Sequence, residues 1–338
     1  MTKIIRCIKK YFFVIAVAFF FSCNQEKKNN TVNASLPASI GEFNEKIKAD
    51  SNNPDLYHQR AKYYFDHKEL ESALADARRA INIDSTKGSY YLTLSDIYFI
   101  NNKTRDSKIA LEKCIAVDPK NTEAILKLAE LYFYVTKYQE AMNYINMALK
   151  IDQHIAKAYF MKGMIFKEQS DTAKAISSME TSIEQDQNNY AAYMQLGVLY
   201  AAKKNKLAVE YFDNALRIQP QSGEANYAKG KFYQDIEEWN NAIKTYDQLL
   251  QIAPVNKFAH YNLGVIHFGI TKEYSKAIKH FEEAIKIDPE YYQAYFGRGS
   301  CYEAMDDLKK ALEDYKTALK IKPDYIPAAE RIKRLKIK

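Results

Sequence analysis

The sequence has little of the material that builds strands, long loops or disulfide frameworks. Its 338 residues include only 10 Gly, 8 Pro and 4 Cys. No Val- and Thr-rich stretch alternates in the way that predicts a strand. We therefore expect an all-α protein. Aromatic residues, in contrast, are plentiful: 27 Tyr and 17 Phe stand against a single Trp, and they recur at regular intervals.

A strong positive charge on the folded part of the chain is also missing. The net charge is +7, but Lys3, Arg6, Lys9 and Lys10 lie in a segment that we expect to be removed, which leaves +3. Residues 330–338, with five basic residues and one acid, contribute +4 of this charge, so the rest is close to neutral. Because nucleic-acid binding needs a strong basic stripe, we expect no nucleic-acid partner.

The motifs of common catalytic sites are absent too. The sequence contains no Gly-rich phosphate loop, no nucleophile elbow and no H-E-x-x-H zinc motif. Each of these motifs supplies a specific chemistry that a catalytic site would need. We therefore expect no enzyme activity and no cofactor.

The first 22 residues predict a signal peptide. A basic stretch precedes an apolar run over 11–21, which is shorter than the roughly 20 residues that cross a bilayer as a helix and suits a secretory signal. The run ends at Ser22 and Cys23, and polar residues follow. This resembles a bacterial lipoprotein signal, in which the Cys is lipidated and becomes the new N-terminus. Phe20 stands where such signals most often have Leu.

The resemblance implies a lipid anchor at Cys23, which would hold the protein on a membrane. Plain secretion and an uncleaved anchor are the alternatives. Residues 23–36 are rich in Asn and Lys and carry few apolar side chains, which predicts a flexible tether.

The rest of the chain repeats a unit of about 34 residues, and such a period decides the whole fold. In the last unit Tyr295, Gly299 and Tyr302 follow at spacings of four and three, which places them on one face of a helix. Ala311 and Tyr315 mark a second helix four residues apart. The small position is Gly in five units, although Gly in a helix costs about 0.5–1 kcal/mol. We infer that a neighbouring helix lies close to it.

This pattern resembles the tetratricopeptide repeat family, whose 34-residue unit has an aromatic, Leu-Gly, Tyr, Ala, Phe and Pro at these intervals. The resemblance covers residues 54–325 and implies a right-handed superhelical solenoid of eight helix–turn–helix repeats. We expect a half-repeat over 37–53 before them and a capping helix over 326–338, with a basic outer face, after them. The predicted repeats are 54–87, 88–121, 122–155, 156–189, 190–222, 223–256, 257–291 and 292–325. The fifth is one residue shorter and the seventh one residue longer, in both cases within the turn between the helices.

The first helix of each repeat should line the concave groove of such a solenoid. The side chains next to the aromatic positions should then face the groove, and they are mostly apolar. Exposed apolar surface of this extent marks an interaction site, although tight winding of the solenoid offers an alternative in which it is buried. The predicted partner-binding residues are Leu92, Phe99, Leu126, Phe133, Phe160, Met194, Tyr227, Tyr261, Phe268 and Phe296.

Histidine and cysteine give two smaller expectations. His260 and His267 lie seven residues apart on one helix face, which allows a metal site, but they replace Tyr of other repeats, so we interpret them as packed or hydrogen-bonded core residues. The other histidines are dispersed along the chain: His58, His67, His154 and His280. Cys114 and Cys301 lie in repeats too far apart to form a disulfide, which needs Cα atoms within about 7 Å.

The sequence therefore predicts a non-catalytic scaffold for protein–protein interactions in the bacterial cell envelope. It would be exported and anchored on the periplasmic face or the outer membrane, and would bind a peptide segment or a helix of other envelope proteins in the concave groove. The alternative is a lipoprotein that binds glycan or peptidoglycan.

Overall fold

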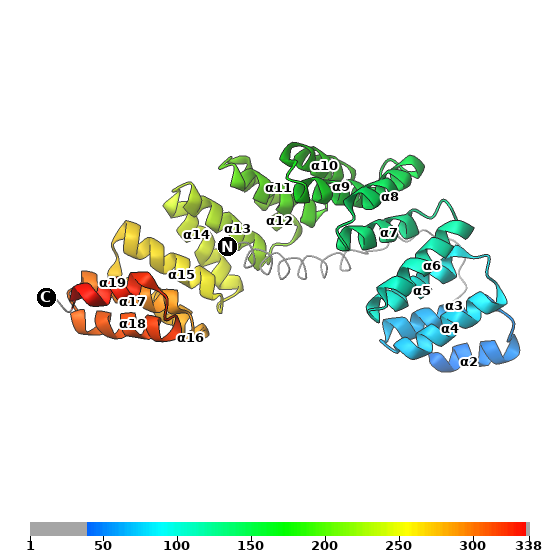
Figure 1. Ribbon diagram of the computed structural model, residues 1–338, viewed down its shortest axis with the longest axis horizontal. Helices are drawn as coiled ribbons and strands as arrows, with labels where there is room; N and C mark the ends of the chain where they lie inside the picture. Colours follow the sequence, from blue (N-terminus) through cyan, green and yellow to red (C-terminus); the bar gives the residue numbers. More distant parts are fainter. Residues whose placement is uncertain (1–38, 336–338) are drawn as a thin grey trace. The chain divides into compact units, whose positions relative to one another are not determined.

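The computed structural model describes residues 39–335, so the predicted signal peptide, Cys23 and the tether lie outside the described residues. Every regular element within 39–335 is a helix: eighteen α-helices, α2 to α19, and one π-helical turn, η1 (Figure 1). The all-α prediction is confirmed. None of these helices is both long and apolar enough to cross a bilayer. The chain divides into two compact units, with the boundary between Ile83 and Asp84.

The first unit contains α2 (Ile40–Ala49), α3 (Pro54–Asp66) and α4 (Leu70–Ile83). The buried Phe43 of α2 packs against Tyr63 of α3, with ring centroids 5.9 Å apart. Arg60 of α3 donates to both carboxylate oxygens of the buried Asp76 of α4, at 2.6 and 2.8 Å. The single helix α2 therefore packs against the first helix of this pair.

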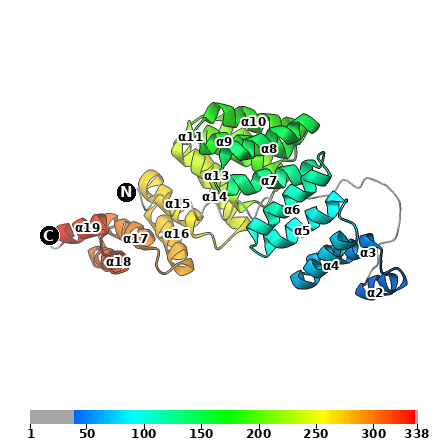
Figure 2. The same cartoon turned by 45° about the vertical axis from the view of Figure 1, so that its right-hand side comes forward.

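The second unit consists of seven helix pairs and a final helix (Figures 1 and 2). In each pair the two helices pack against each other, and the second also contacts the first helix of the next pair. This is the arrangement of a helical repeat solenoid. The pairs are α5 (Gly88–Ile100) with α6 (Thr104–Val117), α7 (Thr122–Tyr134) with α8 (Tyr138–Ile151), α9 (Ala156–Glu168) with α10 (Thr172–Gln185), α11 (Tyr190–Ala202) with α12 (Leu207–Ile218), α13 (Gly223–Asp235) with α14 (Trp239–Ile252), α15 (Lys257–Ile266) with α16 (Tyr274–Ile287), and α17 (Tyr292–Ala304) with α18 (Leu308–Ile321).

The recurrent glycine of the first helices is explained by a large side chain of the second helix. A Cβ added at Gly197 would lie 2.5 Å from the ring of Phe212, and one at Gly264 would lie 2.7 Å from the ring of Phe281. Real Cβ atoms do not approach other atoms so closely, so a larger residue would force the helices of a pair apart. The inference that a neighbour lies close to this position is confirmed.

The turn between the two helices of every repeat contains one residue in the left-handed backbone region, and none of these is Gly. In the third repeat, for example, Thr136 has a φ of 61°, and the next amide, of Lys137, donates to the carbonyl of Tyr132 at 2.8 Å. Such a bond satisfies a carbonyl at the end of the first helix. The left-handed residues are Lys68, Asn102, Thr136, Ser170, Lys204, Glu237, Lys272 and Asp306.

The additional residue of the seventh repeat lies in a π-helical turn, η1 (His267–Thr271), which extends α15. We expected this residue to lengthen the turn between the helices. Instead the first helix is widened before the turn, and the amide of Glu273 donates to the carbonyl of His267 at 2.9 Å. Turns of this kind are rare and insert a residue without breaking a helix.

The last helix, α19 (Ile326–Leu335), packs on the final repeat. Ala328 is buried, and Ile332 and Leu335 contact the cluster around Tyr315. Arg331 and Arg334 both form ion pairs with Glu303 of α17, and their side chains remain 39% and 55% exposed. Part of the positive charge on the exposed face of α19 is therefore compensated by Glu303.

Candidate interaction face

The first helices of the second unit, α5, α7, α9, α11, α13, α15 and α17, present the side chains that we expected to bind a partner. We call this surface the first-helix face. Four of the ten residues follow the alternative in which they are buried, with exposed fractions of only 4–8%: Leu126, Phe133, Phe160 and Met194. The other six are half-buried: Leu92, Phe99, Tyr227, Tyr261, Phe268 and Phe296. Whether these positions bind a partner stays a prediction.

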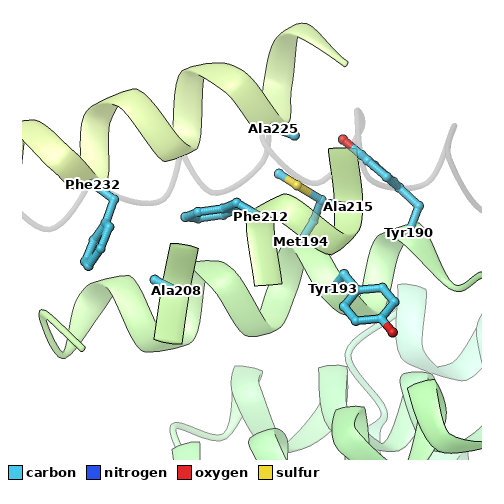
Figure 3. Packing of buried hydrophobic residues seen from close by; sticks show 8 residues of the cluster. All are labelled: Tyr190, Tyr193, Met194, Ala208, Phe212, Ala215, Ala225 and Phe232. Atoms are coloured by element: carbon cyan, nitrogen blue, oxygen red, sulfur yellow. The ribbon is translucent and has the colours of Figure 1, made fainter. Parts of the chain in front are cut away.

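The buried residues pack between neighbouring helices. Figure 3 shows Met194 of α11 beside Phe212 of α12 and Ala225 of α13, in one buried cluster. Phe133 of α7 packs against Tyr138 of α8, with ring centroids 5.7 Å apart. Burial between helices was the alternative that the sequence left open, and it holds in the central repeats.

Charged and polar side chains link successive first helices from α5 to α11. Lys127 of α7 lies 2.7 Å from both carboxylate oxygens of Asp96 of α5, and Lys157 of α9 lies 2.7 Å from Glu130 of α7. The last contact, at 2.5 Å, joins Lys167 of α9 to the side-chain oxygen of Gln195 of α11. We call this series of six residues the polar ladder.

Burial governs the acid–base behaviour of the polar ladder. It raises the pKa of Asp96 in spite of the adjacent Lys127. Burial also opposes the charge on Lys127, but this ammonium faces both Asp96 and Glu123, and its pKa is raised. Lys167, whose partner is an uncharged amide, has its pKa lowered by burial. The ladder therefore joins repeats by two ion pairs and one lysine–amide hydrogen bond, all of them only partly exposed to water.

From α13 to α17 the contacts between successive first helices are made by aromatic rings. Phe258 at the start of α15 lies 6.1 Å from the ring of Tyr227 of α13 and 6.1 Å from that of Tyr291, the N-cap of α17. Tyr261 of α15 lies 5.1 Å from Tyr291. Phe258 is 47% exposed, and Val255, in the turn before α15, is 75% exposed. We call Tyr227, Val255, Phe258, Tyr261 and Tyr291 the aromatic patch.

The seventh repeat also brings three histidines together. The Nδ1 atoms of His260 and His280 lie 3.3 Å apart, and the rings of His267 and His280 are stacked at 5.5 Å. His267 Nδ1 lies 2.9 Å from a carboxylate oxygen of Glu273, and His260 Nε2 lies 3.1 Å from the carbonyl of Pro254. Burial lowers the pKa of His280 to about 4, and the two other imidazoles add to the effect.

The interpretation of His260 and His267 as packed, hydrogen-bonded residues agrees with these contacts. Describing His280 as dispersed was wrong, because its position on α16 faces both of them across the helix pair. Within residues 39–335 no three His, Cys, Asp or Glu side chains are grouped as metal ligands. Cys114 and Cys301 are buried free thiols, as expected.

The sequence pattern did not predict the polar ladder or most of the aromatic patch, because the prediction compared only the residues next to the aromatic positions of each repeat. The spacing of oppositely charged residues could have indicated the ladder. Asp96 and Lys127 are 31 residues apart, and Glu130 and Lys157 are 27 apart. In a 34-residue repeat such separations bring side chains of successive first helices together.

Comparison with known families supports the repeat assignment. Profiles described as "Tetratricopeptide repeat" match residues 292–325, 160–223, 88–121 and 223–256, and one described as "TPR repeat" matches 271–306. Three of these matches span the same residues as predicted repeats.

Two curated proteins share short stretches with the chain. The small glutamine-rich tetratricopeptide repeat-containing protein 2 of Saccharomyces cerevisiae is 35% identical over 81 residues, which are 22% of this chain and 23% of the yeast protein. A protein O-mannosyl-transferase of Caenorhabditis elegans is 38% identical over 65 residues, which are 19% of this chain and 9% of the nematode protein. The chain thus spans less than a quarter of either relative.

Solved structures show the same fold at low identity. The C-terminal part of a TPR repeat-containing protein from Cytophaga hutchinsonii matches with a TM-score of 0.62 and 18% identity, covering 70% of this chain and 98% of that one. Pseudomonas aeruginosa pilF matches with a TM-score of 0.53 and 17% identity, covering 60% and 93%. The family profiles together match more than half of the residues, and the chain therefore belongs to the tetratricopeptide repeat family.

Proposed function

We propose that this repeat scaffold for protein–protein interactions works in the bacterial cell envelope. It is exported, held on a membrane by a lipid at Cys23, and binds a peptide segment or helix of another envelope protein on its first-helix face. Stacked repeats form long surfaces suited to such partners. The N-terminal sequence motivates the location, and the face motivates the mode of binding.

The observation that carries the binding proposal is the exposure of Phe258 and Val255 beside half-buried tyrosines. Aromatic side chains at the centre of an apolar area supply much of the binding energy of protein interfaces. The central side chains Phe133 and Phe160 are buried instead, so charging them would disturb the fold. The aromatic patch is therefore the place at which to test binding.

Photo-crosslinking in the native cell tests the partner proposal. A crosslinking amino acid is placed at Phe258 and, as a control, at Ile109, an exposed apolar residue of α6 on a second helix. We expect position 258 to capture one or a few envelope proteins that position 109 does not capture. Identical products from the two positions, or glycan alone at position 258, would contradict the proposal.

The anchor is tested separately with Cys23→Ala. We expect this variant to move from the membrane fraction to the soluble fraction, because the acyl chains supply the hold on the bilayer. Retention in the membrane fraction would show that the anchor lies elsewhere, and would leave the binding proposal unaffected.

A further inference from the structure

The aromatic patch departs from the repeat pattern at surface positions. The residues that match Phe258 in the other repeats are polar or small: Asp55, Ser89, Glu123, Lys157, Ala191, Glu224 and Gln293. Those that match Val255 are all polar: Thr86, Lys120, His154, Asn188, Gln221, Glu290 and Asp324. Among the eight repeats and the turns that precede them, only the seventh has large apolar residues at both of these surface positions.

Tyr291 departs in the same way, and this departure carries a cost. The N-cap side chain of the first helix accepts an amide hydrogen bond in five other repeats, from Asn53, Asn121, Asn189, Ser222 and Asn256. Tyr291 occupies the N-cap of α17 and makes no such bond. Lys87 and Ile155 also lack this bond, so three of the eight first helices have no side-chain cap. Losing a cap costs about 1 kcal/mol, and of these three N-cap residues Tyr291 is the one that packs against rings of the patch.

Hydrogen-bonding capacity is also left unused on the patch. Neither the Tyr261 nor the Tyr291 hydroxyl has a hydrogen-bond partner within the part of the chain that the structure describes. Asn262 donates to the Tyr227 oxygen at 3.5 Å, which leaves the hydroxyl hydrogen of Tyr227 available. The patch thus combines ring faces with phenol hydroxyls that donate to no protein group in the described residues.

The ammonium group of Lys257, which lies beside these rings, is already paired with a carboxylate. Lys257 Nζ lies 5.1 Å from the centroid of Phe258 and 5.4 Å from that of Tyr291, and it pairs with Asp288 at 2.5 Å. An acidic partner would have to compete with Asp288 for this charge. Charge complementarity therefore favours an uncharged partner segment that offers acceptors.

We propose that the aromatic patch binds an extended, proline-rich segment of a partner protein, an inference that rests on the proposed function and names the kind of partner. A polyproline II segment has no internal hydrogen bonds, so its carbonyls are free to accept from the three hydroxyls. Proline has no amide N–H to leave unsatisfied against the rings. The segment is also pre-ordered, and binding then loses little entropy.

Other peptide modes fit less well. A strand added to a sheet needs an exposed sheet edge, and residues 39–335 contain no strand. A helix satisfies most of its own carbonyls and needs a long apolar groove, whereas the exposed apolar side chains of this patch are only Val255 and Phe258. A glycan would use ring faces too, and it is an outcome of the test below.

The test measures the anisotropy of fluorescein-labelled decaproline during titration with the full chain. Phe258→Glu installs the residue type of the third and sixth repeats, and Tyr291→Asn restores the N-cap, so both variants should fold. We expect decaproline to bind, each variant to weaken binding by at least about tenfold, and Ile109→Glu to leave it unchanged. Circular dichroism melts check that all three variants fold.

The remaining outcomes each contradict the inference. Absence of decaproline binding at millimolar protein would overturn it, as would binding that Phe258→Glu does not weaken. If a labelled amphipathic helical peptide binds through Phe258 instead, the proline-rich partner is wrong and the proposed scaffold function stands. If only a chitin or peptidoglycan oligosaccharide binds through Phe258, both proposals fail.

Discussion

The first-helix face differs between its two ends. From α5 to α11 charged and polar side chains pair across successive repeats through the polar ladder, and from α7 to α11 the apolar side chains are buried between helices. From α13 to α17 the first helices carry rings that remain half-exposed, and the Tyr261 and Tyr291 hydroxyls have no hydrogen-bond partner in the described residues. One fold thus supports a surface whose charged side chains pair with one another and a surface whose aromatic rings remain accessible to a partner.

The difference shows that the same positions of a repeat can serve either the stability of the stack or the binding of a partner. A side chain that serves one of these roles contributes little to the other. A charge paired across two repeats contributes to stacking, and an exposed ring contributes little until a partner covers it. Variants of the polar ladder should therefore change stability, and variants of the aromatic patch should change binding. Four predictions test this contrast.

The largest effect is expected from Lys127→Met. It leaves Asp96 without its ammonium partner in a site where the two side chains are 27% and 20% exposed. Removing one member of a half-buried pair should cost about 2–3 kcal/mol, seen as a lower urea midpoint. Lys206→Met is the control, because Lys206 is 77% exposed in its pair with Glu238 and solvent screens such a pair, so its urea midpoint should fall much less. Equal losses would remove the distinction between buried and surface pairs.

The second effect concerns pH and the histidines of the seventh repeat. Because the pKa of His280 is about 4 in the folded chain, the unfolded chain, with a pKa near 6.5, binds more protons between these values. Stability should then fall as the pH is lowered from 7 through 6.5 toward 4.

The groups that face His280 are His260 and His267, and Asp247 interacts electrostatically with His267. His280→Tyr installs the residue type of the third and fifth repeats and should flatten the fall of melting temperature between pH 7 and pH 5. An unchanged slope would assign the pH dependence to other groups.

A smaller effect, in the opposite direction, is expected from Thr136→Gly. Thr136 is β-branched and has a φ of 61°, which Gly adopts without strain. Relief of this strain exceeds the entropy that Gly gains in the unfolded chain, so we expect a gain of about 0.5–1 kcal/mol. Glu237→Gly, at the matching turn in the other half of the face, should gain less because Glu is not β-branched. A loss of stability in Thr136→Gly would contradict the assigned strain.

The smallest change in stability is expected from Phe258→Glu. The side chain is about half exposed, and surface substitutions of this type usually stay within about 0.5 kcal/mol. Thermal melts of Phe258→Glu and Lys127→Met therefore compare directly how much the aromatic patch and the polar ladder contribute to stability. If Phe258→Glu destabilised the chain as much as Lys127→Met, the aromatic patch would be part of the core, and its assignment to binding would fail.

The repeat itself could be predicted because its spacing follows from helix geometry. Gly197 and Gly264 repeat because Phe212 and Phe281 occupy the space of a side chain, and this pairing lies within one repeat. The same regularity gave the helix pairs, the covering helix α2 and the capping helix α19.

The site was less predictable because it depends on contacts between repeats. The burial of Met194 is set by Ala225 of the next first helix, and a pattern read along a single helix does not contain that neighbour. The sequence pattern placed Arg331 and Arg334 on an outer face but did not contain their ion pairs with Glu303 of α17. His280 was missed for a similar reason, since its partners lie on the opposing helix.

The reaction rates of the two buried thiols, Cys114 and Cys301, can be used to compare how often the two ends of the repeat array open. Cys114 lies in α6, and its thiol donates to the carbonyl of Gly88 at 3.1 Å, whereas Cys301 lies in α17. Burial raises their pKa values to about 11 and about 12, so neither forms the reactive thiolate while its repeat is closed. Once Cys7 and Cys23 are replaced by Ala, the rate at which each thiol reacts with a maleimide therefore reports the opening of its own end of the array. Ligand binding at the aromatic patch should then slow the reaction of Cys301 while the reaction of Cys114 proceeds at its former rate.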